Sequence, residues 1–507
     1  MVPKNLFALT TVALALGSSA PWAGAADFPP GITHGRALKK WVLAARTGRA
    51  DAVGIGDSNQ AYGGHGWDHG WSRAMGERFG LFATGLHSAG ENRGQGLGLG
   101  YRCAILSTAC CAPQFDHTNA PAPLDDLMAA DVFMEPMNYL NLTGGLVAGG
   151  GVNLGLQVEA NHPIGVNNRL LYEVSYGVGP GGVGALAPMI RLGQPPYNAV
   201  ASAGPQSTNS ASWGWAVASA EVPAGVRNAA LNGRFTAWGT DMVGPVTVFT
   251  QRFLRADGAG GASLSTLYAK GSQSARDMAH GLLTASDAQL TMFFSLLRER
   301  QGGSKAVLVR VNTGLNDMNE PLGSLGPAAV SDGASSAAFA DNLTAIVLRL
   351  RQVWALNAWN PDELCFLLTV SHPVAAPDDA RLVAYREAAE SVAASLGRCA
   401  VARFDQLTNA TEMLASGWYQ SGGNDRYHLT LGAYEALGRR EVDAVIASAC
   451  FEDLNDDGVV STPDLVEFLG GFGRAATPWS GSDFNGDGVV DTGDLVTLLG
   501  RFGAACP

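Results

Sequence analysis

Beyond its first 25 residues, the 507-residue sequence lacks any apolar run with the length and purity of a transmembrane helix. Its seven cysteines lack the paired CxxC spacing of zinc sites. Charged residues make up only 15% of the chain, and a net charge of −12 argues against nucleic acid as a partner. What remains is a globular protein, long enough for two or three domains.

Residues 1–25 have the pattern of a secretory signal peptide. Lys4 gives a thin positive start, an apolar stretch runs from Leu6 to Leu16, and Ala23-Gly24-Ala25 provides a small-residue cleavage site. A membrane anchor is the alternative, but the apolar run is too short to span a bilayer. We therefore expect a secreted or cell-surface protein, in a compartment that permits disulfides.

The acidity is concentrated in a duplicated motif near the end of the chain. From Cys450 onward there are ten acidic and two basic residues, a net charge of −8, which leaves about −4 for the rest. Two units beginning at Asp453 and Asp483 are identical at 14 of 21 aligned positions. Each has oxygen-bearing side chains at positions 1, 3, 5, 9 and 12 and Gly at position 6, the layout of a calcium loop. With the backbone carbonyl at position 7, the expected Ca²⁺ ligands are Asp453, Asn455, Asp457, Val459, Ser461, Asp464, Asp483, Asn485, Asp487, Val489, Asp491 and Asp494.

Each loop departs from an EF-hand, because position 12 is Asp and no amphipathic helix leads in. A loop followed by a short helix, twice, resembles a dockerin module, and the flanking Cys450 and Cys506 resemble those of cysteine-flanked dockerins. The resemblance implies a small all-α calcium-binding module, residues 449–507, that binds a cohesin-like partner. A bridge between the two cysteines would contribute roughly 4 kcal/mol in the chain-entropy model.

An α/β rhythm occupies two separate stretches. Ala52–Ile55 predicts a strand, and Trp71, Met75 and Phe79 share one face of a following helix. The second stretch alternates again, with Ser286 placed to cap a helix. Its expected strands are 265–269, 306–311, 364–370 and 400–404, with a helix around 382–396. Such alternation predicts a mostly parallel sheet whose functional residues collect at the carboxyl ends of the strands.

Residue types for nucleophilic catalysis lie at the ends of these patterns. Gly56-Asp57-Ser58 follows the first strand, and Asp425-Arg426-Tyr427-His428 precedes an apolar helical stretch. A serine hydroxyl becomes a good nucleophile when a base takes its proton and a third group fixes the tautomer of the base. The order Ser, Asp, His supplies all three roles.

Together with Gly271 and Gly314-Leu315-Asn316-Asp317, these motifs resemble the SGNH/GDSL serine esterases over about residues 45–95 and 263–447. The resemblance implies a three-layer α/β/α core in two parts, 26–95 and 263–448. It implies Ser58 as nucleophile, His428 as general base and Asp425 as its orienting carboxylate. The implied oxyanion hole consists of the backbone N–H groups of Ser58 and Gly271 and the side-chain amide of Asn316. In the GDSL motif that gives this family its name, a leucine follows the serine, whereas Asn59 occupies that position here.

Some alternatives stay open on sequence. Gly90 or Gly94 could replace Gly271 in the oxyanion hole, and His372 competes weakly with His428 because no carboxylate lies three residues before it. His65, Asp68 and His69 have helical metal-ligand spacing, without a second ligand cluster.

Residues 96–262 interrupt the core with alternating apolar patterns and Pro, Gly and Asn turns. We expect an inserted β-sandwich of jelly-roll type that either binds carbohydrate or serves as a structural lid. Trp213, Trp215 and Trp238 would then be a sugar platform or core residues.

The sequence thus predicts an exported serine esterase that deacetylates a polysaccharide and is anchored through a calcium-binding module. A lipid or small acyl ester is the alternative substrate. A non-catalytic assembly protein with a vestigial site is the alternative class. No cofactor is expected for catalysis itself.

Overall fold

A computed structural model describes residues 31–61, 66–88, 102–105, 140–142, 154–159, 164, 168–182, 184–192, 198–212, 214–222, 234–238, 240–243, 246–269, 273–300, 305–319, 334–374, 378–479 and 481–506. These residues belong to two compact units, which divide after Cys450.

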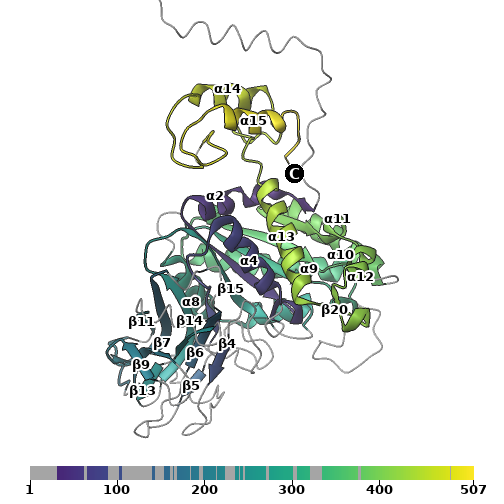
Figure 1. Ribbon diagram of the computed structural model, residues 1–507. Coiled ribbons are helices and arrows are strands. Elements are labelled where there is room, and N and C mark those ends of the chain that lie inside the picture. The colour runs from purple at the N-terminus through teal and green to yellow at the C-terminus, as the bar shows by residue number, and fades with distance from the viewer. Residues whose placement is uncertain are drawn as a thin grey trace, which may run out of the picture. The chain divides into compact units, whose positions relative to one another are not determined.

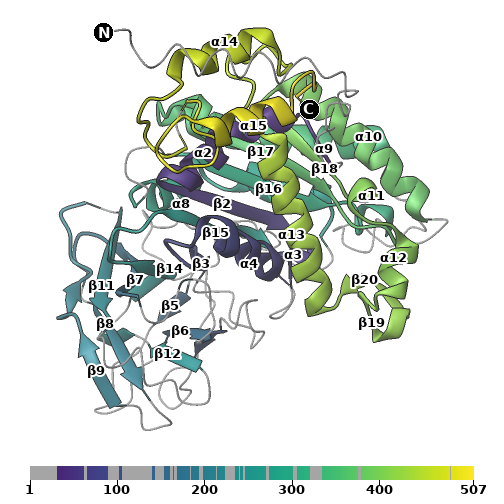
Figure 2. The same cartoon turned by 45° about the horizontal axis from the view of Figure 1, so that its top comes forward.

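The first unit (Figure 1) is built on a six-stranded sheet in the order β1-β18-β17-β16-β2-β15, of which the last five strands are labelled in Figure 2. Five strands are parallel, and the short edge strand β1 is antiparallel to β18. The strands are β1 (Ile32–Thr33), β18 (Cys399–Arg403), β17 (Leu364–Val370), β16 (Val307–Thr313), β2 (Arg49–Gly56) and β15 (Gly261–Ala269). The predicted mixed α/β architecture with a mainly parallel sheet is therefore confirmed. The sheet also contains β15, whose first residue lies just inside the expected insert.

Helices cover both faces of this sheet (Figure 2). One face packs in a single apolar cluster with α7 (Ala275–Thr284), α8 (Asp287–Arg298), α9 (Ser336–Leu356) and α10 (Asp378–Leu396). On the other side lie α2 (Lys39–Thr47), α4 (Trp67–Phe79) and α13 (Leu431–Ser448). Ser286 caps α8 as predicted, accepting a hydrogen bond from the backbone N–H of Gln289. Shorter elements are η1 (Gly35–Leu38), α3 (Ser58–Ala61), η2 (Asp317–Asn319), η3 (Pro361–Glu363), α11 (Phe404–Leu407), α12 (Ala410–Ala415), β19 (Tyr419–Gln420), η4 (Ser421–Gly423) and β20 (Asp425–Leu429).

A buried ion pair lies between the sheet and the helical layer that contains α2, α4 and α13. Arg310 of β16 is bonded to Glu441 of α13 at 2.8 Å, and both side chains are fully buried. Arg310 also donates to Gln60, and Trp71 donates to Glu441. The network joins α3, α4 and α13 to the sheet, so these elements hold one fixed arrangement.

The described residues between β2 and β15 that follow α4 form antiparallel sheets. One sheet contains β11, β7, β14, β3 and β5, another β10, β8, β13 and β9, and a third β12, β6 and β4. Their bounds are β3 (His87–Ser88), β4 (Arg102–Ile105), β5 (Leu140–Leu142), β6 (Leu154–Glu159), β7 (Leu170–Val178), β8 (Ala185–Leu192), β9 (Asn198–Ser202), β10 (Gln206–Ser207), β11 (Gly214–Glu221), β12 (Arg234–Trp238), β13 (Thr240–Val243) and β14 (Val246–Arg255). A β-rich insert is thus observed, and its jelly-roll-like sandwich form stays a prediction.

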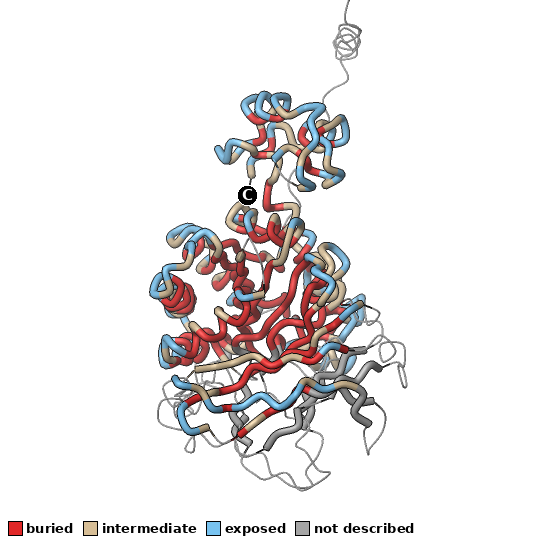
Figure 3. Tube along the Cα trace, turned by 90° about the vertical axis from the view of Figure 1, so that its left-hand side faces the viewer, coloured by how far each residue is buried: buried red, intermediate tan, exposed pale blue. Residues whose placement is uncertain are grey.

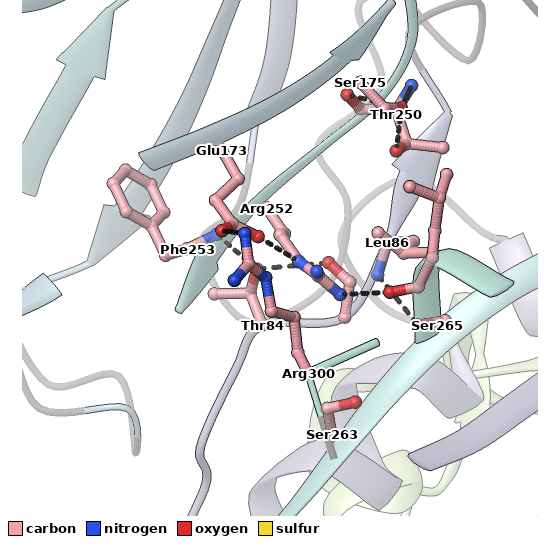
Figure 4. Close-up of polar contacts among 12 residues, drawn as sticks. Thr84, Leu86, Glu173, Ser175, Thr250, Arg252, Phe253, Ser263, Ser265 and Arg300 are labelled. Carbon is pink, nitrogen blue, oxygen red and sulfur yellow. Dashed lines mark hydrogen bonds and ion pairs between the residues drawn. The ribbon is translucent and has the colours of Figure 1, made fainter. Parts of the chain in front are cut away.

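The insert is fixed to the α/β core by buried polar contacts (Figure 4). Glu173 of β7 bonds Arg252 of β14 at 2.8 Å and Arg300, just past α8, at 2.8 Å. Arg252 also donates to the carbonyl of Leu296 on α8. Because unpairing either buried charge is costly, these contacts make the insert part of the same compact unit.

The position of Trp215 bears on whether the tryptophans of the insert form a sugar platform or belong to the core. Its side chain, with that of Val217, packs against the apolar cluster of the α/β core. Trp215 therefore belongs to the packing between insert and core. Trp213 and the side chain of Trp238 lie outside the described residues.

The second unit contains α14 (Thr462–Gly471) and α15 (Thr492–Gly500), each preceded by an acidic loop. Figure 3 shows the contrast in burial, with the strands of the central parallel sheet almost wholly buried and much of the second unit exposed. Cys450 and Cys506 are both disulfide-bonded, whereas Cys365 and Cys399 are buried free thiols. Among the described residues, no helix is both long enough and apolar enough to span a membrane.

Candidate functional site

The turn that carries Ser58 follows β2 directly. β2 ends at Gly56, Asp57 makes the turn, and Ser58 begins α3. A Cβ at position 56 would lie 2.6 Å from the Cβ of Gln60 and 3.0 Å from the carbonyl oxygen of Asn312, so only glycine fits here. The turn therefore places residue 58 at the carboxyl end of a central strand, while the serine side chain itself lies outside the described residues.

Asp425 and His428 form a hydrogen-bonded pair on β20. Nδ1 of His428 lies 2.9 Å from Oδ2 of Asp425, and the other carboxylate oxygen accepts the backbone N–H groups of Tyr427 and His428. Partial burial acts to raise the pKa of Asp425, but the hydrogen bonds from His428 outweigh it and hold this pKa below its ordinary value. An ionised Asp425 fixes the proton on Nδ1, which leaves Nε2 of His428 as the proton acceptor.

Asn316 follows β16, with its side-chain amide pointing back toward β2. Its Nδ2 donates to Oδ2 of Asp57 at 3.3 Å and to the carbonyl of Gln273 at 3.0 Å. Asp317 holds the loop, accepting the backbone N–H groups of Gly314 and Ala275. Gly271 and its alternatives Gly90 and Gly94 lie outside the described residues, but Gln273 brings the segment just after Gly271 into contact with Asn316.

The carboxyl group of Asp57 connects the three elements. Complete burial raises its pKa to about 6, against the opposing effects of its bonds to Asn59 and of the charges of His428 and Arg310. The hydroxyl of Tyr434 contacts Asn59 at 2.5 Å and the backbone N–H of Leu429 at 3.5 Å, so the residues that follow Ser58 and His428 lie close together. The structure thus collects the Ser58 turn, the Asp425–His428 pair and the Asn316 amide at one edge of the sheet.

His372 has a different position from the one a general base needs. It is wholly buried, and burial lowers its pKa to about 4. Its Nε2 lies 3.1 Å from the backbone carbonyl of Arg426, so this nitrogen carries the proton and donates. His372 therefore supports the loop that carries Asp425 and His428.

Of the three candidate metal ligands near the first core segment, only the side chain of His69 lies within the described residues. His69 pairs with Glu435 at 2.8 Å. His65 and the side chain of Asp68 lie outside the described residues. Over the described part of the chain, only Asp453, Asp457 and Asp464 bring three possible ligand atoms within 4.8 Å of one another.

The first acidic loop fits a hard cation. Asp453 and Asp464 are fully buried carboxylates, and buried carboxylates need hydrogen bonds or a metal to offset lost hydration. Backbone N–H groups supply part of that, from Gly458 to Asp453 and from Leu454 to Asp464. In the second loop Asp483 and Asp494 are equally buried, with matching bonds from Gly488 and Phe484.

Sequence reasoning missed two side chains at the site. Tyr434 of α13 donates to Asn59 at 2.5 Å, and Asp57 accepts from Asn316. Asp57 lies inside a recognised motif, so its neighbourhood was predictable. Nothing in the apolar pattern of α13 distinguishes Tyr434 from an ordinary core residue.

Comparison with known proteins gives the fold. No family model and no curated protein matches the chain in sequence. A solved peptidoglycan O-acetylesterase matches with a TM-score of 0.50 at 13% identity, over 83% of this chain and 98% of its own. A family two carbohydrate esterase from Cellvibrio japonicus matches at 12% identity over 63% and 97% of the two chains, with a TM-score of 0.24. An acetyl xylan esterase, Est2A from Butyrivibrio proteoclasticus, matches at 10% over 68% and 97%, also with a TM-score of 0.24. The chain thus has the fold of a solved esterase.

Proposed function

We propose that this protein is a serine esterase of the SGNH type that removes acetyl groups from a polysaccharide. The observation that supports this most directly is the 2.9 Å bond between His428 and Asp425, which Tyr434 links to the Ser58 turn through its contacts with Leu429 and Asn59. The acetylated-glycan substrate is inferred from the peptidoglycan O-acetylesterase that shares the fold.

In the proposed mechanism, Nε2 of His428 takes the proton of the Ser58 hydroxyl as its oxygen attacks the ester carbonyl. Asp425 stabilises the imidazolium that forms. The backbone N–H groups of Ser58 and Gly271 donate to the oxyanion. The amide of Asn316 joins them when the substrate draws one of its two N–H groups away from the carbonyl of Gln273. Collapse of the tetrahedral intermediate expels the sugar hydroxyl, which takes the proton from His428. Water activated by the same imidazole then releases acetate and restores Ser58.

A substrate panel tests the proposal, with Ser58→Ala as the blank. The panel contains p-nitrophenyl acetate, esters of longer acyl chains and O-acetylated glycans. We expect acetate release from a glycan by the wild type and none above background by the variant. Preference for long acyl chains would move the substrate to lipids, and wild type no faster than Ser58→Ala on every ester would leave a non-catalytic protein.

Asn316 gives a prediction of its own. In Asn316→Ala, kcat should fall roughly 10²–10³-fold because one oxyanion donor is lost, with KM nearly unchanged. Steady-state kinetics on the best ester of the panel would measure both. Asn357→Ala is a matched control, since that partly buried amide at the end of α9 bonds Thr291 of α8 and should affect stability without lowering kcat. A rise in KM with unchanged kcat would contradict the assigned role.

We further propose that the C-terminal unit is a dockerin-like module that binds Ca²⁺ and attaches a secreted enzyme to a cohesin-like partner. The proposed ligands are those of the two acidic loops named above, and the cation would order the loops without taking part in ester cleavage. Matched positions on the two helices support a partner surface. Val466 and Val496 are 64% and 65% exposed, and Leu469 and Leu499 are exposed as well.

A further inference from the structure

Four buried or partly buried residues form one continuous chain of hydrogen bonds behind the candidate site. Tyr434 Oη lies 2.5 Å from Oδ1 of Asn59. The backbone N–H of Asn59 donates to Oδ1 of Asp57 at 2.8 Å. The other oxygen of Asp57 accepts from Asn316 at 3.3 Å. The chain therefore runs from the helix after His428, through the residue after Ser58, to the oxyanion amide.

The direction of each bond follows from the chemistry of its partners. The atom of Asn59 that faces Tyr434 is its amide oxygen, which can only accept. Tyr434 must then donate its hydroxyl proton to Asn59. Its oxygen is also the acceptor for the backbone N–H of Leu429, at 3.5 Å. A single phenol thus contacts the residue that follows the nucleophile and the residue that follows the base.

We propose that Asn59 and Tyr434 are positioning residues that hold the Ser58 turn, the His428 loop and the Asn316 amide in register. The inference rests on the proposed esterase function. Misplacing reacting groups by about 1 Å can cost roughly 100-fold in rate, so a short bond between these distant segments has catalytic value. The leucine that SGNH esterases carry after the serine has no atom to accept a proton from Tyr434, so the bond depends on the asparagine found here.

The charge of Asp57 gives this role a distinctive pH dependence. The carboxyl must be ionised to accept from Asn59 and Asn316 together, and burial raises its pKa to about 6. Bonds from Asn59 oppose that rise, as do the facing charges of His428 on β20 and of Arg310 on β16. Removing the Asn59 amide therefore raises the pKa of Asp57 further. The acid limb of kcat/KM should move to higher pH in Asn59→Leu, and stay in place in Tyr434→Phe.

A double-mutant cycle tests the inference. In Asn59→Leu and Tyr434→Phe we expect kcat to fall about tenfold or more with KM little changed, and the double variant to be no slower than the slower single one. Tyr172→Phe, which removes a buried phenol hydroxyl from β7 in the antiparallel sheets, should leave the pH profile unchanged. Losses that multiply in the double variant, an unmoved acid limb in Asn59→Leu, or effects matched by Tyr172→Phe would overturn the inference.

Unfolding measurements keep this test separate from the enzyme assay. If the bond exists, urea unfolding should show the double variant destabilised by less than the sum of the single variants. Additive destabilisation would overturn the inference even in an active esterase. Conversely, a wild type that cleaves no ester would defeat the proposed function, and the unfolding cycle would still decide whether the bond couples the two segments.

Discussion

Replacing His428 with alanine should lower kcat roughly 10⁴–10⁶-fold, the scale on which a serine hydrolase loses its base. The reason lies in the geometry of β20. Asp425 accepts a hydrogen bond from the protonated Nδ1, so Nε2 of His428 is the acceptor assigned to the Ser58 hydroxyl. Without it, residual turnover would come only from binding and the oxyanion donors. Steady-state kinetics on the preferred ester would measure the loss, with far-UV circular dichroism verifying the fold.

Two further histidines serve as controls for that result. His280 is exposed on α7, and His280→Ala should keep wild-type kcat. His372→Ala should lower kcat less than His428→Ala, because His372 acts on the backbone carbonyl of Arg426 and has no exposed nitrogen. If His428→Ala retained even a tenth of wild-type turnover, His428 would not be the general base.

The sequence alone was sufficient to predict the strands and turns that carry the candidate catalytic residues, because each of these features depends on a short stretch of chain. Apolar runs ending in glycine predict β2 and β16, and each delivers its polar residue to the carboxyl end of the sheet. The spacing of Asp425 and His428 is equally local, since three residues of a short extended segment are enough to close their bond. These features need only short-range patterns, and all of them appear in the structure.

The connections between those segments could not be predicted, because they depend on residues far apart in the chain. Tyr434 and Asn59 are 375 residues apart, and nothing in either local pattern names the other. Likewise, the local sequence around Glu173 and around Arg252 indicates only strands. Their ion pair forms because β7 and β14 pair with each other beside α8. Trp215, a candidate sugar platform on sequence, packs against the core for the same reason. Long-range packing decides which polar residue is a surface group and which is a structural partner.

Removing calcium should have the second large effect, confined to residues 451–506. Without a cation, the buried carboxylates of Asp453 and Asp464 repel each other, and hydrogen bonds from backbone N–H groups and from Ser461 offset this in part. Metal binding supplies on the order of 10 kcal/mol to the folding of small metal-dependent domains. Chelation should therefore abolish amide-exchange protection across both loops, α14 and α15. Hydrogen exchange read by mass spectrometry would localise the change.

Ester turnover should survive the same treatment, because every candidate catalytic residue belongs to the other compact unit. Asp464→Asn and Asp494→Asn then separate the two loops. Each keeps the shape of the side chain and removes one charge, so each should weaken protection mainly in its own loop and raise the calcium needed to restore it. Chelation that changed no protection would mean that hydrogen bonds alone stabilise these carboxylates, and that the loops are acidic turns. Turnover lost with chelation would instead make the cation part of the enzyme's own fold, since no carboxylate of either loop is assigned to the reaction.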